Sequence, residues 1–233
     1  MEGSAKSKNV SNYEMLAQYY DELLQDEEAL SLWLKYIEEE DFHSVLELAS
    51  GSGVMASILK NKGYDVIASD ISEAMRDVAR NNFDGEYLIL NMTDYKLDRK
   101  FDLILCICDS INYLYEDELS KFFECAAKHL SKNGRLIFDM HHRQRLLEFK
   151  EQYIEEGFVS DVPYQWTIQA DDFDNTINEH FTFYTNDGMI QEHHTQNVFD
   201  PETVKRKMEA CFDIKMIEDF VEDEKILMVG YLK

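Results

Sequence analysis

The stretch from Val45 to Gly53 constrains the fold of this chain more than any other. It begins with a short apolar run, Val45 to Leu48, that is broken only by Glu47, and it then turns into a loop of small residues. Glycines in such a loop permit positive φ angles and let a ligand approach the bare backbone. The apolar periodicity that follows predicts a helix, whose first N–H groups have no partner inside the helix. The stretch therefore predicts a strand, a tight turn and a helix.

A carboxylate at the end of the next predicted strand extends this pattern. The strand covers Asp65 to Ser69, and Asp70 follows it, nineteen residues after Gly51. That spacing is close to the roughly 20 residues that separate a glycine loop from the carboxylate that holds a nucleoside ribose. The sequence therefore predicts that the core of the chain binds a nucleoside-bearing cofactor.

Two kinds of cofactor compete for this site. Residues 51–56 match G-x-G-x-x-A, the dinucleotide fingerprint, which favours an NAD-dependent oxidoreductase. Two features oppose that interpretation. Glu47 lies four residues before Gly51, where its charge would oppose a pyrophosphate, and an aromatic-rich helical segment precedes the strand, whereas a dinucleotide domain usually opens with the strand.

The run Glu47-Leu-Ala-Ser-Gly-Ser-Gly resembles motif I of the class I S-adenosylmethionine-dependent methyltransferases, D/E-x-G-x-G-x-G. Alanine replaces the first glycine and narrows the space at the amino-acid end of the cofactor. The resemblance implies an α/β fold with a Rossmann-like seven-stranded sheet and helices on both faces. It also implies that S-adenosylmethionine is bound by Glu47, Ala49, Ser50, Gly51, Gly53 and Asp70. A non-catalytic module that binds the same cofactor would carry the same residues and stays an alternative.

Two helices are predicted before this core. Apolar residues from Tyr13 to Leu24 follow a helical period, and a second helix covers residues 28–39. The first resembles the Y-x-x-x-A-x-x-Y-D-x-L opening of a bacterial subgroup of these methyltransferases, which implies a lid over residues 1–40. Tyr13, Tyr20 and Trp33 are then expected to line the pocket, where aromatic faces attract a sulfonium cation. Packing in the core is the alternative role for these aromatic side chains.

The resemblance assigns further cofactor contacts along the chain. Ile71 and Met75, which follows a predicted N-cap at Ser72, match the positions that flank the adenine. After the third strand, Asn91 and Met92 stand where family members often carry Asp-Met. An asparagine oxygen can still accept a hydrogen bond from the adenine amino group, and Asp94 is the alternative acceptor.

Three residues are candidates for chemistry on the acceptor. The fourth strand, 101–107, runs into Asp109, and ligands of open α/β sheets bind at the carboxyl ends of strands. A helix is predicted over 117–131 with Asn133-Gly134 as its C-cap, and a fifth strand over 135–140 ends beside His141. Tyr20, Asp109 and His141 are the residues expected to act as a base, since histidine can take a proton near neutral pH. A local turn is the alternative role for Asp109, and a helix-capping or surface position is the alternative for His141.

Residues 163–199 change character and alternate as strands do. A hairpin signal at Asn186-Asp-Gly supports a three-stranded antiparallel insertion over residues 161–199, set into a core of 41–160 and 200–233. His180, His193 and His194 fall within it. Neighbours on a strand point to opposite faces, so His193 and His194 cannot share one ion, and no metal is expected.

The charge of the chain bears on its partners. It has 23 basic and 47 acidic residues, a net charge of −24, and residues 163–199 contain no Lys or Arg. Such a surface opposes phosphate backbones and anionic lipid, so we expect no nucleic acid and no membrane partner. The expected acceptor is a small molecule, with an amine as first candidate. Four cysteines without a Cys-x-x-Cys pair predict reduced core thiols and a cytoplasmic protein, and a homodimer stays an open alternative.

Overall fold

The computed structural model describes residues 13–24, 27–38, 42–221 and 224–233. Its helices are α1 (Leu16–Leu24), α2 (Glu27–Glu38), α3 (Val54–Asn61), α4 (Glu73–Ala79), the 3₁₀ turn η1 (Ser110–Tyr113), α5 (Leu119–His129), α6 (Gln144–Glu148) and α7 (Pro201–Met208). Its strands are β1 (Ser44–Glu47), β2 (Asp65–Asp70), β3 (Glu86–Ile89), β4 (Phe101–Cys106), β5 (Leu130–His141), β6 (Tyr153–Val159), β7 (Val162–Asp171), β8 (Thr176–Thr185), β9 (Gly188–Asn197), β10 (Phe212–Phe220) and β11 (Lys225–Leu232).

Seven strands form the first sheet, in the order β10-β11-β5-β4-β1-β2-β3. Strands β3, β2, β1, β4 and β5 run parallel, and β11 is antiparallel to both of its neighbours. This arrangement confirms the predicted Rossmann-like sheet. Because the parallel strands share a direction, the loops after β1, β2 and β4 meet at one edge, which is where ligands of such sheets bind.

Two apolar layers cover the two faces of this sheet. Leu46 of β1 and Ile104 of β4 face one layer, which holds Phe122 of α5 and Met208 of α7. The neighbouring residues along the same strands face the other layer, which contains Trp33 of α2 and residues of α3. Side chains alternate between faces along a strand, so apolar runs covered on both sides produce two cores.

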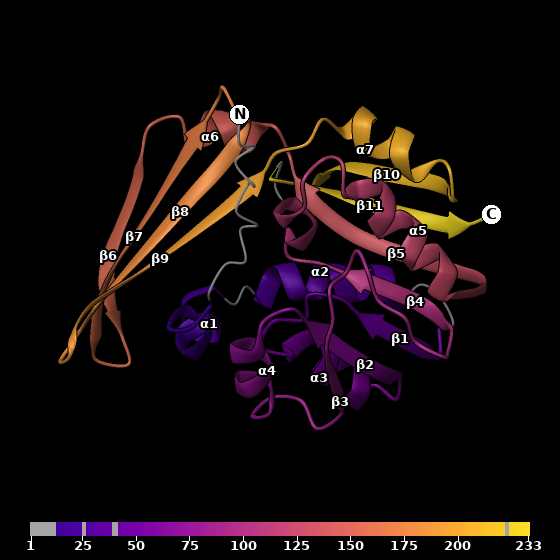
Figure 1. The fold of residues 1–233 in the computed structure, drawn as a ribbon, viewed down its shortest axis with the longest axis horizontal. Helices are drawn as coiled ribbons and strands as arrows, with labels where there is room; N and C mark the ends of the chain where they lie inside the picture. Colours follow the sequence, from indigo (N-terminus) through magenta and orange to yellow (C-terminus); the bar gives the residue numbers. More distant parts are fainter. Residues whose placement is uncertain (1–12, 25–26, 39–41, 222–223) are drawn as a thin grey trace, which may run out of the picture.

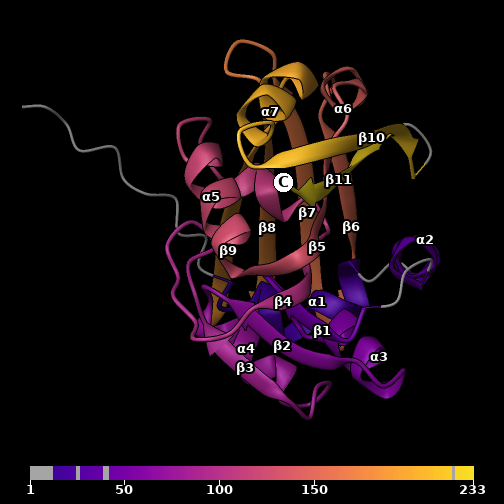
Figure 2. The ribbon, with the colours of Figure 1, turned by 90° about the vertical axis from the view of Figure 1, so that its right-hand side faces the viewer.

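The second sheet has four antiparallel strands in the order β6-β7-β8-β9. Figure 1 shows these long strands standing beside the first sheet, and the perpendicular view of Figure 2 places them behind it. The predicted insertion was three-stranded, and the strand that the prediction missed is β6. Four of its seven residues are exposed, including Ile154 and Phe158, because β6 is an edge strand. It therefore lacks the in-and-out alternation of hydrophobic residues that identifies a half-buried strand.

Helix α1 connects the two sheets. Its Leu16 packs with Tyr164, Phe181 and Phe183 of the second sheet. Glu192 of β9 accepts hydrogen bonds from the backbone N–H groups of Met15 and Leu16, so a carboxylate from another element caps this helix. The helix therefore begins at Leu16, whereas the sequence placed its start at Tyr13.

The end of α5 also differs from the prediction. The helix ends at His129 with Leu130 as its cap, and β5 begins at once by pairing Leu130 with Phe101. Asn133 adopts a positive φ of 70° inside this irregular start of β5, so Asn133-Gly134 is not a helix C-cap. The local turn chemistry was recognised correctly, but sheet pairing places Asn133 four residues beyond His129, the last residue of the helix.

Two further observations concern the surface. Cys108 is exposed and Cys211 is half-buried, so only Cys106 and Cys125 are the core thiols that the sequence predicted. Among the residues described, no helix combines the length and the apolar character that crossing a membrane requires.

Candidate active site

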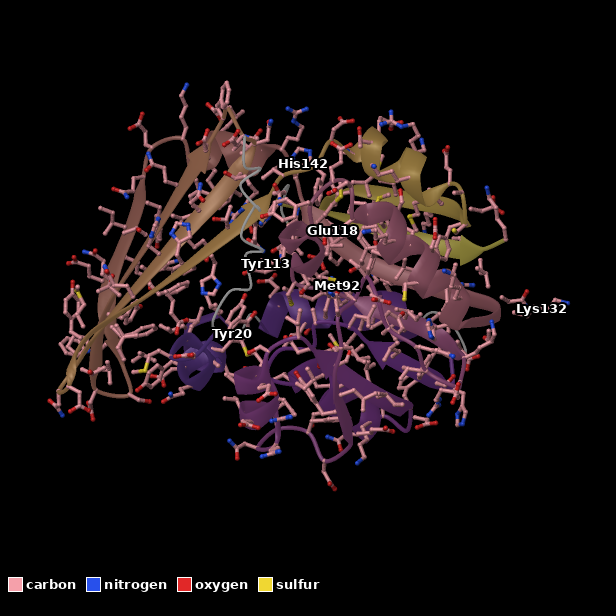
Figure 3. The ribbon with its side chains drawn as sticks, in the orientation of Figure 1. Tyr20, Met92, Tyr113, Glu118, Lys132 and His142 are labelled. Carbon is pink, nitrogen blue, oxygen red and sulfur yellow. The ribbon has the colours of Figure 1, made fainter. Side chains whose placement is uncertain are left out.

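A cavity of about 590 Å³ lies at the carboxyl edge of the first sheet. Its walls come from the loops after β1, β2 and β4, from α1 and α2, and from one face of the second sheet. Figure 3 shows Tyr20, Met92 and Tyr113 in the region between the sheets, whereas Lys132 lies at the far end of the first sheet. The volume falls within the roughly 300–1,000 Å³ that small-molecule and cofactor sites occupy.

The loop after β1 exposes backbone to the cavity. Ala49 and Gly51 both have positive φ angles, 52° and 54°. The Tyr87 hydroxyl donates to the Gly51 carbonyl at 2.6 Å and fixes the turn from outside. Ala49 therefore adopts the left-handed conformation that a glycine would adopt without steric cost. The tight turn survives the replacement of the first glycine of the motif.

Asp70 holds this loop to the next one. Its two carboxylate oxygens accept from the Gly51 N–H at 3.1 Å and from the Ser72 N–H at 2.8 Å. Burial raises the pKa of Asp70, and these backbone donors offset part of the rise. Each carboxylate oxygen has a second lone pair, so the group can still accept bonds from ribose hydroxyls.

Glu47 is a buried carboxyl group at the floor of the cavity. It is 2% exposed and accepts a hydrogen bond from the Ser50 hydroxyl at 2.7 Å. Burial raises the pKa of Glu47 to about 8, against the lowering effect of the Ser50 bond. A cation in the cavity would favour the ionised form of this group.

Helix α1 also contacts the glycine loop. Asp21 accepts from the Ser52 hydroxyl and, at 2.7 Å, from the Asn82 side chain. A β-carbon built on Gly51 would lie 3.9 Å from Cε1 of Tyr20, so this ring stands over the glycine. Helix α1 thus forms a wall of the cavity.

A buried charge network lies at the end of β4. Lys225 of β11 lies 2.8 Å from Oδ2 of Asp109 and 3.5 Å from Oδ2 of Asp139. Burial alone would raise the pKa of Asp109, but the charges of His141 and Lys225 lower it to about 2. Burial raises the pKa of Asp139 to about 7, with a further rise from Asp109. The network therefore keeps Asp109 ionised and favours a protonated Asp139 below neutral pH.

His141 adjoins this network. Its Nδ1 lies 3.5 Å from Oδ1 of Asp109, and its Nε2 lies 2.9 Å from Oε1 of Gln196 on β9. Burial lowers the pKa of His141 despite the neighbouring Asp109, so the ring is neutral near pH 7. A neutral imidazole can accept a proton, but contact with Gln196 occupies one ring nitrogen.

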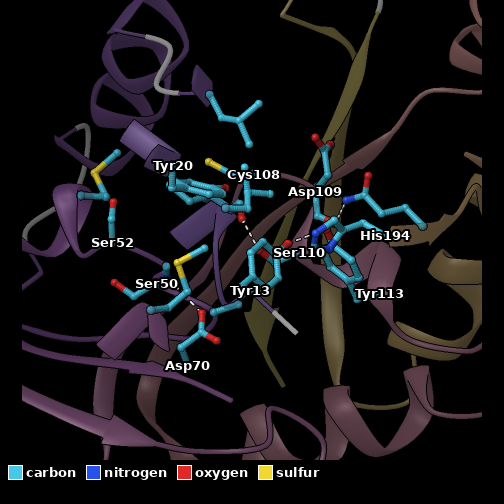
Figure 4. A pocket seen from close by; sticks show the side chains of 18 of the residues that line it. Tyr13, Tyr20, Ser50, Ser52, Asp70, Cys108, Asp109, Ser110, Tyr113 and His194 are labelled. Carbon is cyan, nitrogen blue, oxygen red and sulfur yellow. Dashed lines mark hydrogen bonds between the residues drawn. The ribbon is translucent and has the colours of Figure 1, made fainter. Parts of the chain in front are cut away.

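Aromatic side chains from the start of α1, from η1 and from the second sheet meet in the cavity. The Tyr13 and Tyr113 hydroxyls lie 2.6 Å apart, and the Tyr13 ring centroid lies 4.5 Å from that of His194 (Figure 4). His194 is 2% exposed, yet neither ring nitrogen has a hydrogen-bond partner. Its neighbour His193 points outward, where its Nδ1 lies 2.9 Å from Nδ1 of His180.

The cavity brings together almost all of the residues singled out from the sequence. It is lined by Tyr13, Tyr20, Trp33, Glu47, Ala49, Ser50, Gly51, Asp70, Ile71, Met75, Asn91, Met92, Asp109 and His141. Gly53 does not line it: a β-carbon there would lie 3.1 Å from that of Phe83 and 3.2 Å from that of Ala79, so this glycine permits close packing against the end of α4. The Asn91 side-chain oxygen accepts from the N–H and hydroxyl of Thr93, so it also shapes its own loop.

Several lining residues were assigned no role from the sequence. They are Tyr113, Arg145, Trp166, Glu179, His194, Gln196 and Lys225. Alternation along β8 and β9 would have placed Glu179 and His194 on one face only if their register had been known. Lys225 comes from the far end of the chain, and no local pattern links it to Asp109.

The residues present fit S-adenosylmethionine. Ser50 and Gly51 offer backbone at the loop, Asp70 offers a carboxylate to a ribose, and Ile71 and Met75 offer apolar contact to a base. Tyr20 and Tyr13 present aromatic rings, which attract a sulfonium cation. The buried Glu47 suits the positively charged amino group of the cofactor.

Comparisons with known proteins agree with this geometry. Residues 45–134 match a family described as "Methyltransferase domain". The chain is 26% identical to "Putative methyltransferase YqeM" of Bacillus subtilis (strain 168), over 91% of each chain. A solved S-adenosylmethionine-dependent methyltransferase from Clostridium acetobutylicum shares the fold with a TM-score of 0.78, 24% identity, and 94% of this chain and 98% of that chain covered.

A sugar N-methyltransferase, KedS8, from a Streptoalloteichus species shares the fold with a TM-score of 0.81 at 19% identity, with 100% of this chain and 98% of that chain covered. The fold, the matched domain and the methyltransferase relatives all favour S-adenosylmethionine over a dinucleotide. The chain is therefore a class I S-adenosylmethionine-dependent methyltransferase.

Proposed function

We propose that the protein methylates a small-molecule amine. The observation that carries this proposal is the charge of the cavity wall. Seven lining residues are acidic (Asp21, Glu47, Asp70, Asp109, Glu118, Glu179 and Glu224), and two are basic (Arg145 and Lys225). Such a wall favours a cationic or neutral acceptor over an anionic one, because like charges brought together in a poorly solvated site repel strongly.

The form of the cavity supports a small acceptor. The second sheet and α1 both line it, so it is bounded on the side away from the first sheet. Nucleic acid would require an open basic surface that replaces counterions, and this chain has a net charge of −24. The N-methyltransferase of similar fold is described as acting on a sugar, which agrees with a small amine acceptor.

The residues assigned to the cofactor keep the roles given above, as part of the proposal. S-Adenosylmethionine supplies an activated methyl group, so the protein has to align the acceptor nitrogen with it and exclude water. Tyr13, Tyr20 and Trp33 form the aromatic wall that excludes water. Within the predicted lid of residues 1–40, α1 and α2 act as the lid, and residues 1–12, 25–26 and 39–40 lie outside the described residues. Residues 41–160 and 200–233 act as the core, and residues 161–199, extended by β6, act as the cover over the acceptor.

Three residues are proposed to assist the acceptor. Asp109 stays ionised beside Lys225 and holds the charge network next to the acceptor, and His141 positions Gln196 of β9. Burial raises the pKa of Tyr20 well above its usual value, which keeps its hydroxyl protonated as a hydrogen-bond donor.

The test measures transfer of a labelled methyl group from S-adenosylmethionine to three classes of acceptor: small amines, small neutral alcohols and bulk tRNA. Transfer to an amine, and none to tRNA at about 0.15 M salt, is the expected result. Asp109→Asn should lower kcat/KM at least about tenfold, and Asp117→Asn, at an acidic residue outside the cavity wall, is its control. Labelling of tRNA alone, or of alcohols alone, would refute the proposal.

A further inference from the structure

The inner face of the second sheet carries a pair of polar side chains with no assigned role. Glu179 of β8 lies directly opposite His194 of β9, and both line the cavity. Side chains at directly opposed positions of antiparallel strands have β-carbons roughly 4.5–5.5 Å apart. Glu179 and His194 therefore present a carboxyl group and an imidazole side by side to the same space.

The surroundings of His194 give its ring nitrogens no hydrogen-bond partner. The ring is buried against Tyr13, at 4.5 Å between centroids, and against Phe181, at 5.9 Å. Neither Nδ1 nor Nε2 forms a hydrogen bond, and the nearest carboxylate, that of Glu192, lies 3.7 Å from Nε2. Buried polar atoms are normally paired, so an unpaired imidazole in a cavity wall indicates a ligand that completes it.

Glu179 adds a buried carboxyl group beside His194. Burial raises the pKa of Glu179, and His194 and Arg145 offset part of that rise. The group lies on the same face as Trp166 and Phe181, whose rings stack with centroids 5.2 Å apart. A carboxyl group beside aromatic faces is the combination that recognises an organic ammonium ion.

The two basic side chains of the wall are already neutralised. Lys225 pairs with Asp109 and Asp139, and Arg145 lies 2.8 Å from Glu148 and 3.4 Å from Glu224. Among the described residues that line the cavity, no Lys or Arg lacks a carboxylate partner. A phosphate or carboxylate on the acceptor would therefore meet no free cation, and separating either ion pair to provide one would be costly.

We infer that Glu179 and His194 form an ammonium subsite, and that the acceptor is an organic amine without a phosphate or carboxylate group. This inference rests on the proposed function and narrows it. The acceptor nitrogen enters as an ammonium ion that pairs with Glu179. One of its protons moves to a ring nitrogen of His194, which leaves the amine lone pair free and the imidazole protonated.

The test compares amines that carry no anionic group with amines that carry one. Glucosamine is compared with glucosamine 6-phosphate, and spermidine with sarcosine, in transfer of a labelled methyl group by the full chain. In each pair, we expect kcat/KM to be at least about tenfold higher for the member that carries no anionic group. Glu179→Gln should raise the KM for the amines about tenfold or more with a smaller change in kcat. Glu156→Gln, at an exposed residue of the same sheet, should leave both unchanged.

A binding measurement makes the result independent of turnover. Calorimetry on protein saturated with S-adenosylhomocysteine should show that glucosamine or spermidine binds to the native chain and to Glu156→Gln, and about tenfold more weakly to Glu179→Gln. His194→Gln should lower kcat about tenfold or more and change amine binding less, a split that a merely structural role would not produce.

Two outcomes separate the possible failures. Equal use of the anionic and non-anionic acceptors, or an unchanged KM in Glu179→Gln, would overturn this inference and leave amine methylation intact. Absence of amine binding, with methyl transfer to alcohols alone, would overturn both the inference and the proposed function.

Discussion

The two halves of the cavity are built in different ways. The glycine-loop half comprises residues 47–53 and 70–75. It presents mainly backbone groups and carboxylates that accept hydrogen bonds from backbone N–H groups, as Asp70 does. In the second-sheet half, the inner face of β7 to β9, the contacts are those of side chains such as Glu179 and His194. A site built from backbone groups suits one fixed ligand. The side chains of the other site, in contrast, can be replaced with little effect on the fold. We therefore expect the first half to fix the cofactor and the second half to select the acceptor.

The largest effect is expected at Asp70. If this effect were absent, the first half of the cavity would not be the half that fixes the cofactor. Asp70→Ala removes the acceptor of two backbone N–H groups and, in the proposed cofactor role, of the ribose hydroxyls, and a hydrogen bond to a charged group contributes about 1.5–3 kcal/mol. We expect the dissociation constant for S-adenosylmethionine to rise roughly 10- to 100-fold by calorimetry. Asp77→Ala, at an exposed residue of α4, is the control. Tight binding of NAD to the native chain, with none of S-adenosylmethionine, would refute the cofactor assignment.

The second prediction concerns the start of helix α1, which the second sheet caps through Glu192. Glu192→Ala leaves the N–H groups at the start of α1 without their partner, and an unsatisfied buried donor costs about 1–3 kcal/mol. Hydrogen exchange at Leu16 should become roughly 10- to 100-fold faster, and the cofactor should dissociate faster. Glu22→Ala, which removes the exposed contact of α1 with Ser160, should have a smaller effect. Equal exchange in the native chain and in Glu192→Ala would show that α1 is not capped by the second sheet.

The sequence anticipated the two halves unequally, and for physical reasons. The glycine loop, Asp70 and the cap at Ser72 are local patterns whose geometry follows from a few neighbouring residues, and the structure forms the Ser72 cap as expected. Glu179 and His194 meet only through strand register, and Lys225 reaches Asp109 from 116 residues away. The edge strand β6 and the early end of α5 were missed because tertiary pairing, and not local periodicity, decides both.

The third prediction is a pH dependence that originates in the glycine-loop half. Because folding raises the pKa of Glu47 to about 8, its protonated form stabilises the cofactor-free protein fully below its unfolded pKa, and this contribution is lost as pH rises through 8. Asp139 acts in the same direction up to about pH 7. Asp109, whose pKa is lowered to about 2, loses its contribution only in strong acid.

Between pH 7 and 8 the unfolding free energy should therefore fall by at most about 1.4 kcal/mol through Glu47. Urea unfolding of Glu47→Gln should show a flatter profile in that window, whereas Asp139→Asn should flatten the profile below pH 7. A native chain whose stability rises from pH 7 to 8 would show that Glu47 is ionised in the folded protein.

The smallest expected effect distinguishes packing from cofactor contact within the glycine loop. Gly53 has a φ of 78°, and a β-carbon there would meet Phe83 and Ala79 at 3.1 and 3.2 Å. Gly63 also has a positive φ, 97°, but nothing lies within 4 Å of its β-carbon position. Gly63→Ala therefore measures backbone strain alone, roughly 1–2 kcal/mol, and Gly53→Ala should cost about 1 kcal/mol more because of overpacking. After correction for the unfolded fraction, neither variant should change the affinity for S-adenosylmethionine more than about twofold. A tenfold loss in Gly53→Ala alone would instead make Gly53 part of the cofactor site.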